Sequence, residues 1–207
     1  VLDKEETLRN IRKLKENFKS ADTLPSVYLI HGDLTIQEMS YMYNNPKIKC
    51  FISCTHGEGF GRPLLEASCC GLPVIASKWS GHLDFLNEKE SLLIEGHLKE
   101  VPKGQIWKPI IVEPSKWFNV NETDVIRKIR MFHKKYSIFN KKGKRLGKAN
   151  LRDHSLEKMA RKFNTILDNV LKQIPSSVSL KLPKLKKVGG NTKSNTTVKL
   201  PKLKKIT

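Results

Sequence analysis

The stretch KIKCFISCTHGEGFGRPLLEASCCGLPVIASKWSGHLD, residues 47–84, decides the fold of this chain. It begins with a short apolar run, residues 48–53, that suits a buried strand. A glycine-rich loop follows, and Pro63 then suits the first turn of a helix that ends at Gly71. A second apolar run, residues 73–77, comes directly after it. A strand, a short helix and a strand in this order predict a parallel βαβ unit.

Helices and strands alternate in the rest of the chain. Helices are predicted for residues 3–19, 35–43, 121–135 and 155–173, and short strands for residues 27–31, 91–94 and 110–112. A loop is predicted for residues 96–108 and a basic turn for residues 141–148. This alternation is typical of the α/β class and predicts a Rossmann-like parallel sheet with helices on both faces. Ligands of such sheets bind beyond the carboxyl ends of the strands.

The composition indicates one globular domain followed by a basic tail. The 207 residues carry a net charge of +19, and 38% of them are hydrophobic. Residues 176–207 contain nine Lys and no acidic residue, and the motif LPKLKK begins at Leu182 and again at Leu200. Proline and crowded like charges oppose a stable helix, so we predict a domain at 1–175 and a disordered tail after it. Docking to an anionic lipid or glycan, and pairing as an edge strand, are the alternatives for this tail.

Hydropathy and cysteine usage bear on the location of the protein. No apolar run approaches the length of a membrane-spanning helix, and no secretory signal is present. The four cysteines, Cys50, Cys54, Cys69 and Cys70, lack the usual spacing of metal ligands and are interpreted as packing residues. Because reduced thiols are usual in the cytoplasm, we predict a cytoplasmic protein, with peripheral membrane contact through the tail as the alternative.

Two carboxylates mark the candidate site. Glu58 lies in the glycine-rich loop, and Glu66 lies eight positions later, in the helix. Because a helical side chain leans toward the helix N-terminus, Glu66 can reach the crevice that Glu58 faces. Free N–H groups at the start of this helix, residues 61–65, favour a phosphate at the same place. Backbone donors for a phosphate and carboxylates for hydroxyl groups together suit a nucleotide-sugar.

The segment HGEGFGRPLLEASCCGLPVIAS, residues 56–77, resembles the donor-binding segment of retaining glycosyltransferases of the GT-B fold, in the large group called family four. The signature of that group is two glutamates separated by seven residues, matched here by Glu58 and Glu66. The flanking sequences are most similar to phage and giant-virus members, and the resemblance covers residues 25–170. It implies the C-terminal, donor-binding half of a GT-B fold.

The resemblance implies a role for each residue of the segment. Glu58, the catalytic residue, accepts hydrogen bonds from the donor sugar, and Glu66 binds the ribose hydroxyls. The other substrate-binding residues offer backbone N–H groups, line the pocket or contact the diphosphate: Gly59, Phe60, Gly61, Arg62, Lys78, Ser80, Gly81 and His82. Plainer alternatives are a surface ion pair for Arg62, inward packing for Phe60 and a helix cap for Ser80.

The resemblance also implies the reaction. A hexose is transferred from a nucleotide-diphosphate sugar to an unknown glycan, lipid or protein acceptor, with retention and with no metal or other cofactor. Catalysis then rests on positioning and on stabilising the leaving diphosphate, and His31 and His56 are interpreted as structural. The acceptor-binding domain and a basic pair for the diphosphate are expected outside this chain, so the chain alone is expected to be inactive. The alternatives are a non-enzymatic protein that binds polyanions or membrane surfaces, and a sugar-nucleotide epimerase.

Overall fold

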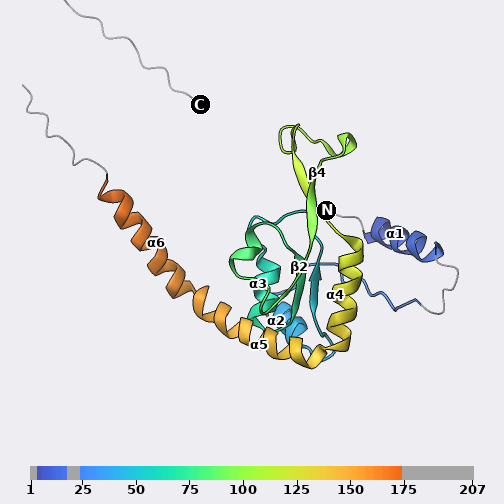
Figure 1. The fold of residues 1–207 in the computed structure, drawn as a ribbon, viewed down its shortest axis with the longest axis horizontal. Coiled ribbons are helices and arrows are strands. Elements are labelled where there is room, and N and C mark those ends of the chain that lie inside the picture. The colour runs from blue at the N-terminus through green and yellow to red at the C-terminus, as the bar shows by residue number, and fades with distance from the viewer. Residues whose placement is uncertain (1–3, 18–23, 174–207) are drawn as a thin grey trace, which may run out of the picture. The chain divides into compact units, whose positions relative to one another are not determined.

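The structure, a computed structural model, describes residues 4–17 and 24–173 of the chain (Figure 1). The helices and strands follow one another as α1 (Lys4–Glu16), α2 (Ile36–Asn44), β1 (Phe51–Ser53), α3 (Arg62–Cys69), β2 (Val74–Ser77), β3 (Leu92–Ile94), β4 (Gly96–Glu100), β5 (Lys116–Val120), α4 (Glu122–Lys134), α5 (Tyr136–Asp153) and α6 (Leu156–Leu171). The short 3₁₀ helices η2 (Gly81–Asp84) and η3 (Lys103–Gln105) lie in the connections. The chain divides into two units after Phe163, and the candidate site lies in the first. The tail predicted at 176–207 lies outside the described residues, so the domain boundary before it stays a prediction.

A parallel sheet of β1, β2 and β3, in that order, lies at the centre of the first unit. β2 is buried along its whole length, and its side chains alternate between two hydrophobic clusters. Val74 and Ala76 lie in one cluster with Leu64 of α3. Ile75 lies in the other cluster with Phe132 of α4. Helices therefore cover both faces of the sheet, as Figure 1 shows for α3 and α4, and the predicted α/β class is confirmed.

The starts of α2 and α4 lie where the sequence predicts them. The hydroxyl of Thr35 accepts a hydrogen bond from the N–H of Glu38 at 3.2 Å, and the carboxylate of Glu38 accepts one from the N–H of Thr35 at 2.8 Å. This capping box satisfies two N–H groups that a helix start leaves free. Asn121 caps α4 by accepting a hydrogen bond from the N–H of Asp124 at 3.3 Å. Both caps join residues three positions apart, so they are visible in the sequence.

Residues 27–31 are predicted as a strand but form none. The side chain of Tyr28 is 87% exposed, and Val27 and Ile30 are exposed as well. A short apolar run becomes a strand only where a neighbouring strand completes its backbone hydrogen bonds. No strand pairs with this run in the part of the chain that the structure describes, and the prediction is wrong for this reason.

The connection between β3 and α4 is a hairpin rather than the predicted loop and lone strand. β4 and β5 pair in antiparallel register over their whole length. Of the strand predicted at 110–112, only Ile111 pairs, in a single bridge with Trp107. In β5 only Phe118 is buried, so this strand lacks the alternating apolar pattern that marks a half-buried strand in a sequence.

The basic segment 141–148 lies inside α5 and forms no turn. Gly143 and Gly147 are four positions apart and therefore lie on the same face of the helix. A Cβ atom on Gly143 would lie 2.8 Å from the carbonyl oxygen of Gly71, and one on Gly147 would lie 2.6 Å from that of Ser68. The two glycines let α5 approach the end of α3 closely. The predicted turn is wrong because this packing overrides the low helix propensity of glycine.

Asp124 ties the start of α4 to the end of β3. Its carboxylate accepts a hydrogen bond from the N–H of Glu95 at 2.8 Å and another from the guanidinium of Arg127, also at 2.8 Å. Burial acts to raise the pKa of Asp124, but these hydrogen bonds outweigh it and hold the pKa below its ordinary value. Since the pKa is lower in the folded chain, the carboxylate stabilises the fold above its unfolded pKa, and this contribution is lost as the pH falls through the folded pKa.

We expect Asp124→Asn to lower the free energy of unfolding by about 1–2 kcal/mol at neutral pH, because a charged acceptor is lost. Urea unfolding over a range of pH should show the difference from wild type shrinking below about pH 4, where the wild-type carboxyl also gains its proton. The exposed Asp33→Asn is the matched control and should change nothing at any pH. A difference for Asp124→Asn that stays constant down to low pH would contradict this role.

Candidate active site

The candidate site lies at the carboxyl edge of the parallel sheet. The glycine-rich loop follows β1, residues 78–80 follow β2, and Glu95 follows β3. The carboxyl ends of parallel strands lie at the same edge, which is where ligands of such sheets bind. The loops at 57–62 and 78–84 are predicted to leave strands at this edge, and the structure brings them into contact there.

The two loops interlock through Ser80 and Gly81. The hydroxyl of Ser80 accepts a hydrogen bond from the N–H of Glu58 at 3.0 Å and donates one to its carbonyl oxygen at 2.5 Å. The N–H of Gly81 donates to the same carbonyl at 3.0 Å. Ser80 has a φ of +86°, a backbone conformation that favours glycine, and its two hydrogen bonds offset this strain. Ser80 precedes η2 without capping it, so its side chain holds the backbone of Glu58 instead.

The start of α3 carries free backbone donors. Gly61 precedes the helix in the left-handed conformation, with a φ of +83°. The N–H groups of residues 59–61 have no hydrogen-bond partner in the described part of the chain. Gly59 and Phe60 are exposed, so a ligand can reach their N–H groups, whereas Gly61 is buried. The donor set at the helix start is smaller than the predicted run at 61–65, because Pro63 has no N–H and the N–H of Leu65 bonds to Gly61 at 3.1 Å.

The two glutamates have different surroundings. Glu58 is half-buried in the loop. Glu66 lies in the second turn of α3, beyond the first turn where a helix dipole acts most strongly, and its side chain is 44% exposed. It pairs with Arg62 at 3.4 Å, so Arg62 forms the surface ion pair given above as its alternative. Phe60 packs against Phe85, with 5.3 Å between the ring centroids, and stays partly exposed.

A pocket of about 450 Å³ lies beside Glu66, between α2 and α3. Its wall is mostly apolar and includes Leu34, Met39 and Tyr43. Burial raises the pKa of Tyr43, and the carboxylate of Glu66 adds to this effect. An apolar wall that ends at a carboxylate is suited to a nucleoside, with the base on the wall and the ribose hydroxyls on the carboxylate.

Lys78 and His82 both have interaction partners within the protein. The ammonium of Lys78 pairs with Glu88 and, at 2.8 Å, with Glu95. These carboxylates, Glu88 first, hold the pKa of Lys78 above its ordinary value. His82 is fully buried, and its Nε2–H donates to the carbonyl oxygen of Ser77 at 2.6 Å. Its Nδ1 has no partner among the described residues, and a Cβ atom on Gly61 would lie 3.1 Å from Cβ of His82.

An aromatic group beside the glycine-rich loop is missed by the sequence analysis. The rings of His56 and Trp117 are stacked with centroids 4.8 Å apart, and those of Trp79 and Phe118 with centroids 5.9 Å apart. The available signals are a histidine directly before the loop and a tryptophan two positions after the end of β2. Their partners on β5 lie far away in the chain, so no local pattern links them.

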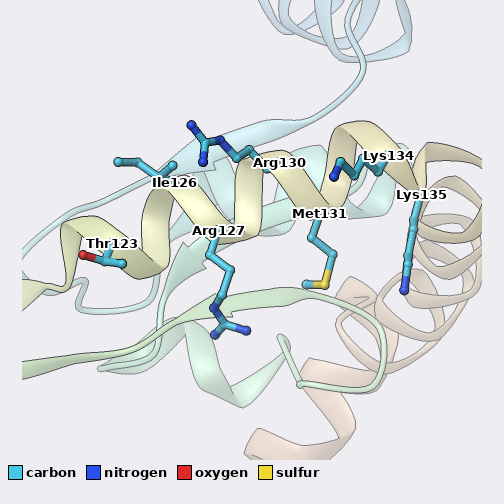
Figure 2. Close-up of a pocket in the computed structure, with 7 residues that line it drawn as sticks. All are labelled: Thr123, Ile126, Arg127, Arg130, Met131, Lys134 and Lys135. Carbon is cyan, nitrogen blue, oxygen red and sulfur yellow. The ribbon is translucent and has the colours of Figure 1, made fainter.

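A second pocket, of about 630 Å³, lies along α4 (Figure 2). Thr123, Ile126 and Met131 line it together with four cationic side chains, those of Arg127, Arg130, Lys134 and Lys135. Figure 2 shows Arg130 above the helix and Arg127, Met131 and Lys135 below it in this view. This surface suits an anionic ligand.

The described residues contain neither a group of metal ligands nor a disulfide. There, no three His, Cys, Asp or Glu side chains are grouped so as to hold a metal ion. The four cysteines are free thiols, and burial raises the pKa of Cys50, so its thiol stays protonated at neutral pH. Among the helices that the structure describes, none has the length and the hydropathy needed to cross a membrane.

Comparison with models of protein families gives a match to part of the chain. Residues 11–103 match the model of the family described as glycosyl transferases group 1. This range contains the βαβ unit, the two interlocking loops and both Glu58 and Glu66. None of the curated proteins compared with the chain matches it. The similarity to this family thus covers the segment that builds the site.

Proposed function

We propose that this domain binds a nucleotide-diphosphate sugar at the carboxyl edge of its sheet. The bound donor then gives up its hexose to an acceptor with retention at the anomeric carbon. Glu58 accepts hydrogen bonds from the sugar hydroxyls, and Glu66 accepts them from the ribose. One observation carries the proposal: the pocket of about 450 Å³ reaches Glu66, while the N–H groups at 59–61 are free at the start of the same helix. A single helix thus offers acceptors to a ribose and donors to a diphosphate.

The cations near the site have a part in this proposal. Arg62 holds Glu66 through an exposed ion pair, and such a pair contributes little stability. When ribose hydroxyls take the place of the guanidinium at Glu66, Arg62 is released and can turn to the diphosphate. Lys78 is the second cation, at the end of β2, and its two carboxylate partners restrain it. Ser80, Gly81 and His82 act by holding the loop that carries Glu58.

The proposed chemistry needs no protein nucleophile. The bond between the anomeric carbon and the diphosphate oxygen breaks, and the acceptor oxygen bonds to the same face of that carbon. The acceptor proton passes to the leaving diphosphate. Positioning and hydrogen bonds to the diphosphate lower the barrier, and no metal is required. A glycan, lipid or protein acceptor, a cytoplasmic location and kinship with phage and giant-virus enzymes stay predictions.

We expect Glu66→Ala to weaken donor binding by about tenfold or more, because two ribose hydroxyls lose a charged acceptor. Isothermal calorimetry of the 207-residue chain with UDP-glucose, GDP-mannose and ADP-glucose measures this effect. Absence of saturable binding for all three donors in the wild type would contradict the proposal.

Glu157→Ala is the matched control for that experiment. Glu157 pairs with Arg161 four positions away at 3.4 Å, the same separation that joins Glu66 and Arg62. Both variants therefore lose a comparable exposed ion pair, and both should retain their thermal stability. Donor affinity should fall only for Glu66→Ala. An equal loss in the two variants would show that Glu66 has no specific role.

Polyanion binding is the second candidate function, and the cationic surface along α4 favours it. Binding to a polyanion such as heparin should weaken steeply as the salt concentration rises, because counterions are released on binding. The contribution of the uncharged hexose to donor binding should depend little on salt. If the donor still binds at high salt, the positive charge of the surface along α4 does not drive donor binding.

A further inference from the structure

Strand β5 of the hairpin is hydrogen-bonded to His56, two positions before Glu58. The N–H of Phe118 donates to the carbonyl oxygen of His56 at 3.1 Å, and Nδ1 of His56 donates to the carbonyl oxygen of Phe118 at 2.9 Å. Since a carbonyl only accepts, Nδ1 carries a proton, and Nε2 is left to contact a ligand. The hairpin thus fixes the orientation of the imidazole two positions before Glu58.

Two tryptophans complete this surface. The ring of Trp117 is stacked on His56 with 8° between the planes, and the ring of Trp79 is stacked on Phe118 with 7° between them. Phe118 is buried, whereas Trp79 is 42% exposed. A Cβ atom on Gly57 would lie 3.9 Å from Cδ1 of Trp79, so the indole reaches the residue next to Glu58. The indole is held in place from one side and exposes apolar surface.

We propose that Trp79, Trp117 and His56 form a subsite for a pyranose ring, beside Glu58. A pyranose has apolar C–H groups on its ring faces and hydroxyl groups at its rim. The C–H groups can pack on the exposed indole, where dispersion and the release of water favour contact. The hydroxyls can donate to the carboxylate of Glu58 and to Nε2 of His56. This inference rests on the proposed function, because it assigns the sugar part of that site.

The pyranose has two sources, the donor's own hexose and a sugar of the acceptor. The first source predicts that the subsite strengthens binding of a nucleotide-sugar relative to its nucleoside diphosphate. The second predicts that the subsite binds a free saccharide. Both sources use the same aromatic surface, and separate titrations distinguish them.

Intrinsic fluorescence reports on this subsite, because two of the three tryptophans in the chain belong to it. Replacing the third, Trp107→Phe, leaves a chain whose tryptophan signal comes from the subsite alone. This chain is titrated with UDP, GDP and ADP, with UDP-glucose, GDP-mannose and ADP-glucose, and with maltotriose and chitotriose. We expect a saturable change with a nucleotide-sugar or a saccharide that exceeds the change with the nucleoside diphosphates.

Trp79→Ala in the full chain should weaken sugar-dependent binding by about tenfold while nucleoside diphosphate affinity stays within about twofold. Loss confined to the nucleotide-sugars assigns the subsite to the donor hexose, and loss confined to the saccharides assigns it to the acceptor. Trp107→Ala is the matched control: this tryptophan lies in the hairpin at 65% exposure, and its loss should change neither affinity.

Two results would overturn the subsite. One is that neither the nucleotide-sugars nor the saccharides lose affinity in Trp79→Ala. The other is that nucleoside diphosphate affinity falls in Trp79→Ala as much as sugar-dependent affinity does and recovers in Trp79→Phe, which retains an aromatic ring against Phe118; the tryptophan would then only support the loop. If the wild type binds no nucleoside diphosphate, the proposed function itself fails, and this result is distinct from failure of the subsite.

Discussion

Gly81→Ala is expected to lower the free energy of unfolding by about 3 kcal/mol or more and to abolish donor binding. The added Cβ atom would lie 2.0 Å from the carbonyl oxygen of Gly59 and 2.7 Å from its carbonyl carbon. Both are backbone atoms, so no rotation of a side chain relieves the overlap. The two loops must separate, and the hydrogen bonds from Gly81 and Ser80 to Glu58 are then lost. Urea unfolding and donor calorimetry measure the two effects.

Gly59→Ala is the matched control for Gly81→Ala. No atom lies within 4 Å of a Cβ atom built on Gly59, so the free energy of unfolding should stay within about 0.5 kcal/mol of wild type. This variant adds the same methyl group to the same pair of loops without forcing them apart. Wild-type stability in Gly81→Ala would mean that the loops do not pack as closely as the structure shows.

Gly147→Ala is expected to lower the free energy of unfolding by about 2 kcal/mol. Alanine improves helix propensity by about 1 kcal/mol, but its Cβ atom would lie 2.6 Å from the carbonyl oxygen of Ser68. Moving α5 away also breaks the buried hydrogen bond of 2.8 Å from Asn150 to the hydroxyl of Ser68. Because α3 carries Glu66, its displacement should weaken donor binding as well. Thermal and urea unfolding measure the loss of stability.

Gly104→Ala controls for the general effect of replacing a glycine. Gly104 lies in η3 with no atom within 4 Å of a Cβ atom, so the variant should match wild type or be slightly more stable. If Gly147→Ala stabilised the chain, helix propensity would outweigh the packing of α5 on α3. The glycines of α5 would then be incidental to the fold.

The parts of the fold that were predictable depend on residues close together in the chain. The strands around α3 follow from two apolar runs separated by a helix that Pro63 begins and Gly71 ends. The capping box joins Thr35 to Glu38, three positions away. In each case the pattern lies within one short stretch of the chain, so the sequence shows it directly.

The incorrect predictions concern segments whose structure depends on distant partners. Residues 27–31 have the composition of a strand and lack a pairing strand in the described part of the chain. The glycines at 143 and 147 suggest a turn until α3 is placed against them. The hairpin of β4 and β5 has one buried side chain in β5, so its pairing leaves little trace in the sequence.

The candidate site divides in the same way. The sequence by itself determined that Glu58 lies in a loop after a strand and Glu66 on the following helix, because spacing and glycine positions act locally. The strand, β1, is only partly buried, so its predicted burial is wrong. Only the tertiary structure decided how Glu58 is held: the hydroxyl of Ser80 binds its backbone from 22 positions away. It also decided that His56 meets β5, 62 positions away. Such contacts form only when the folded sheet brings its carboxyl ends together, so no sequence window contains them.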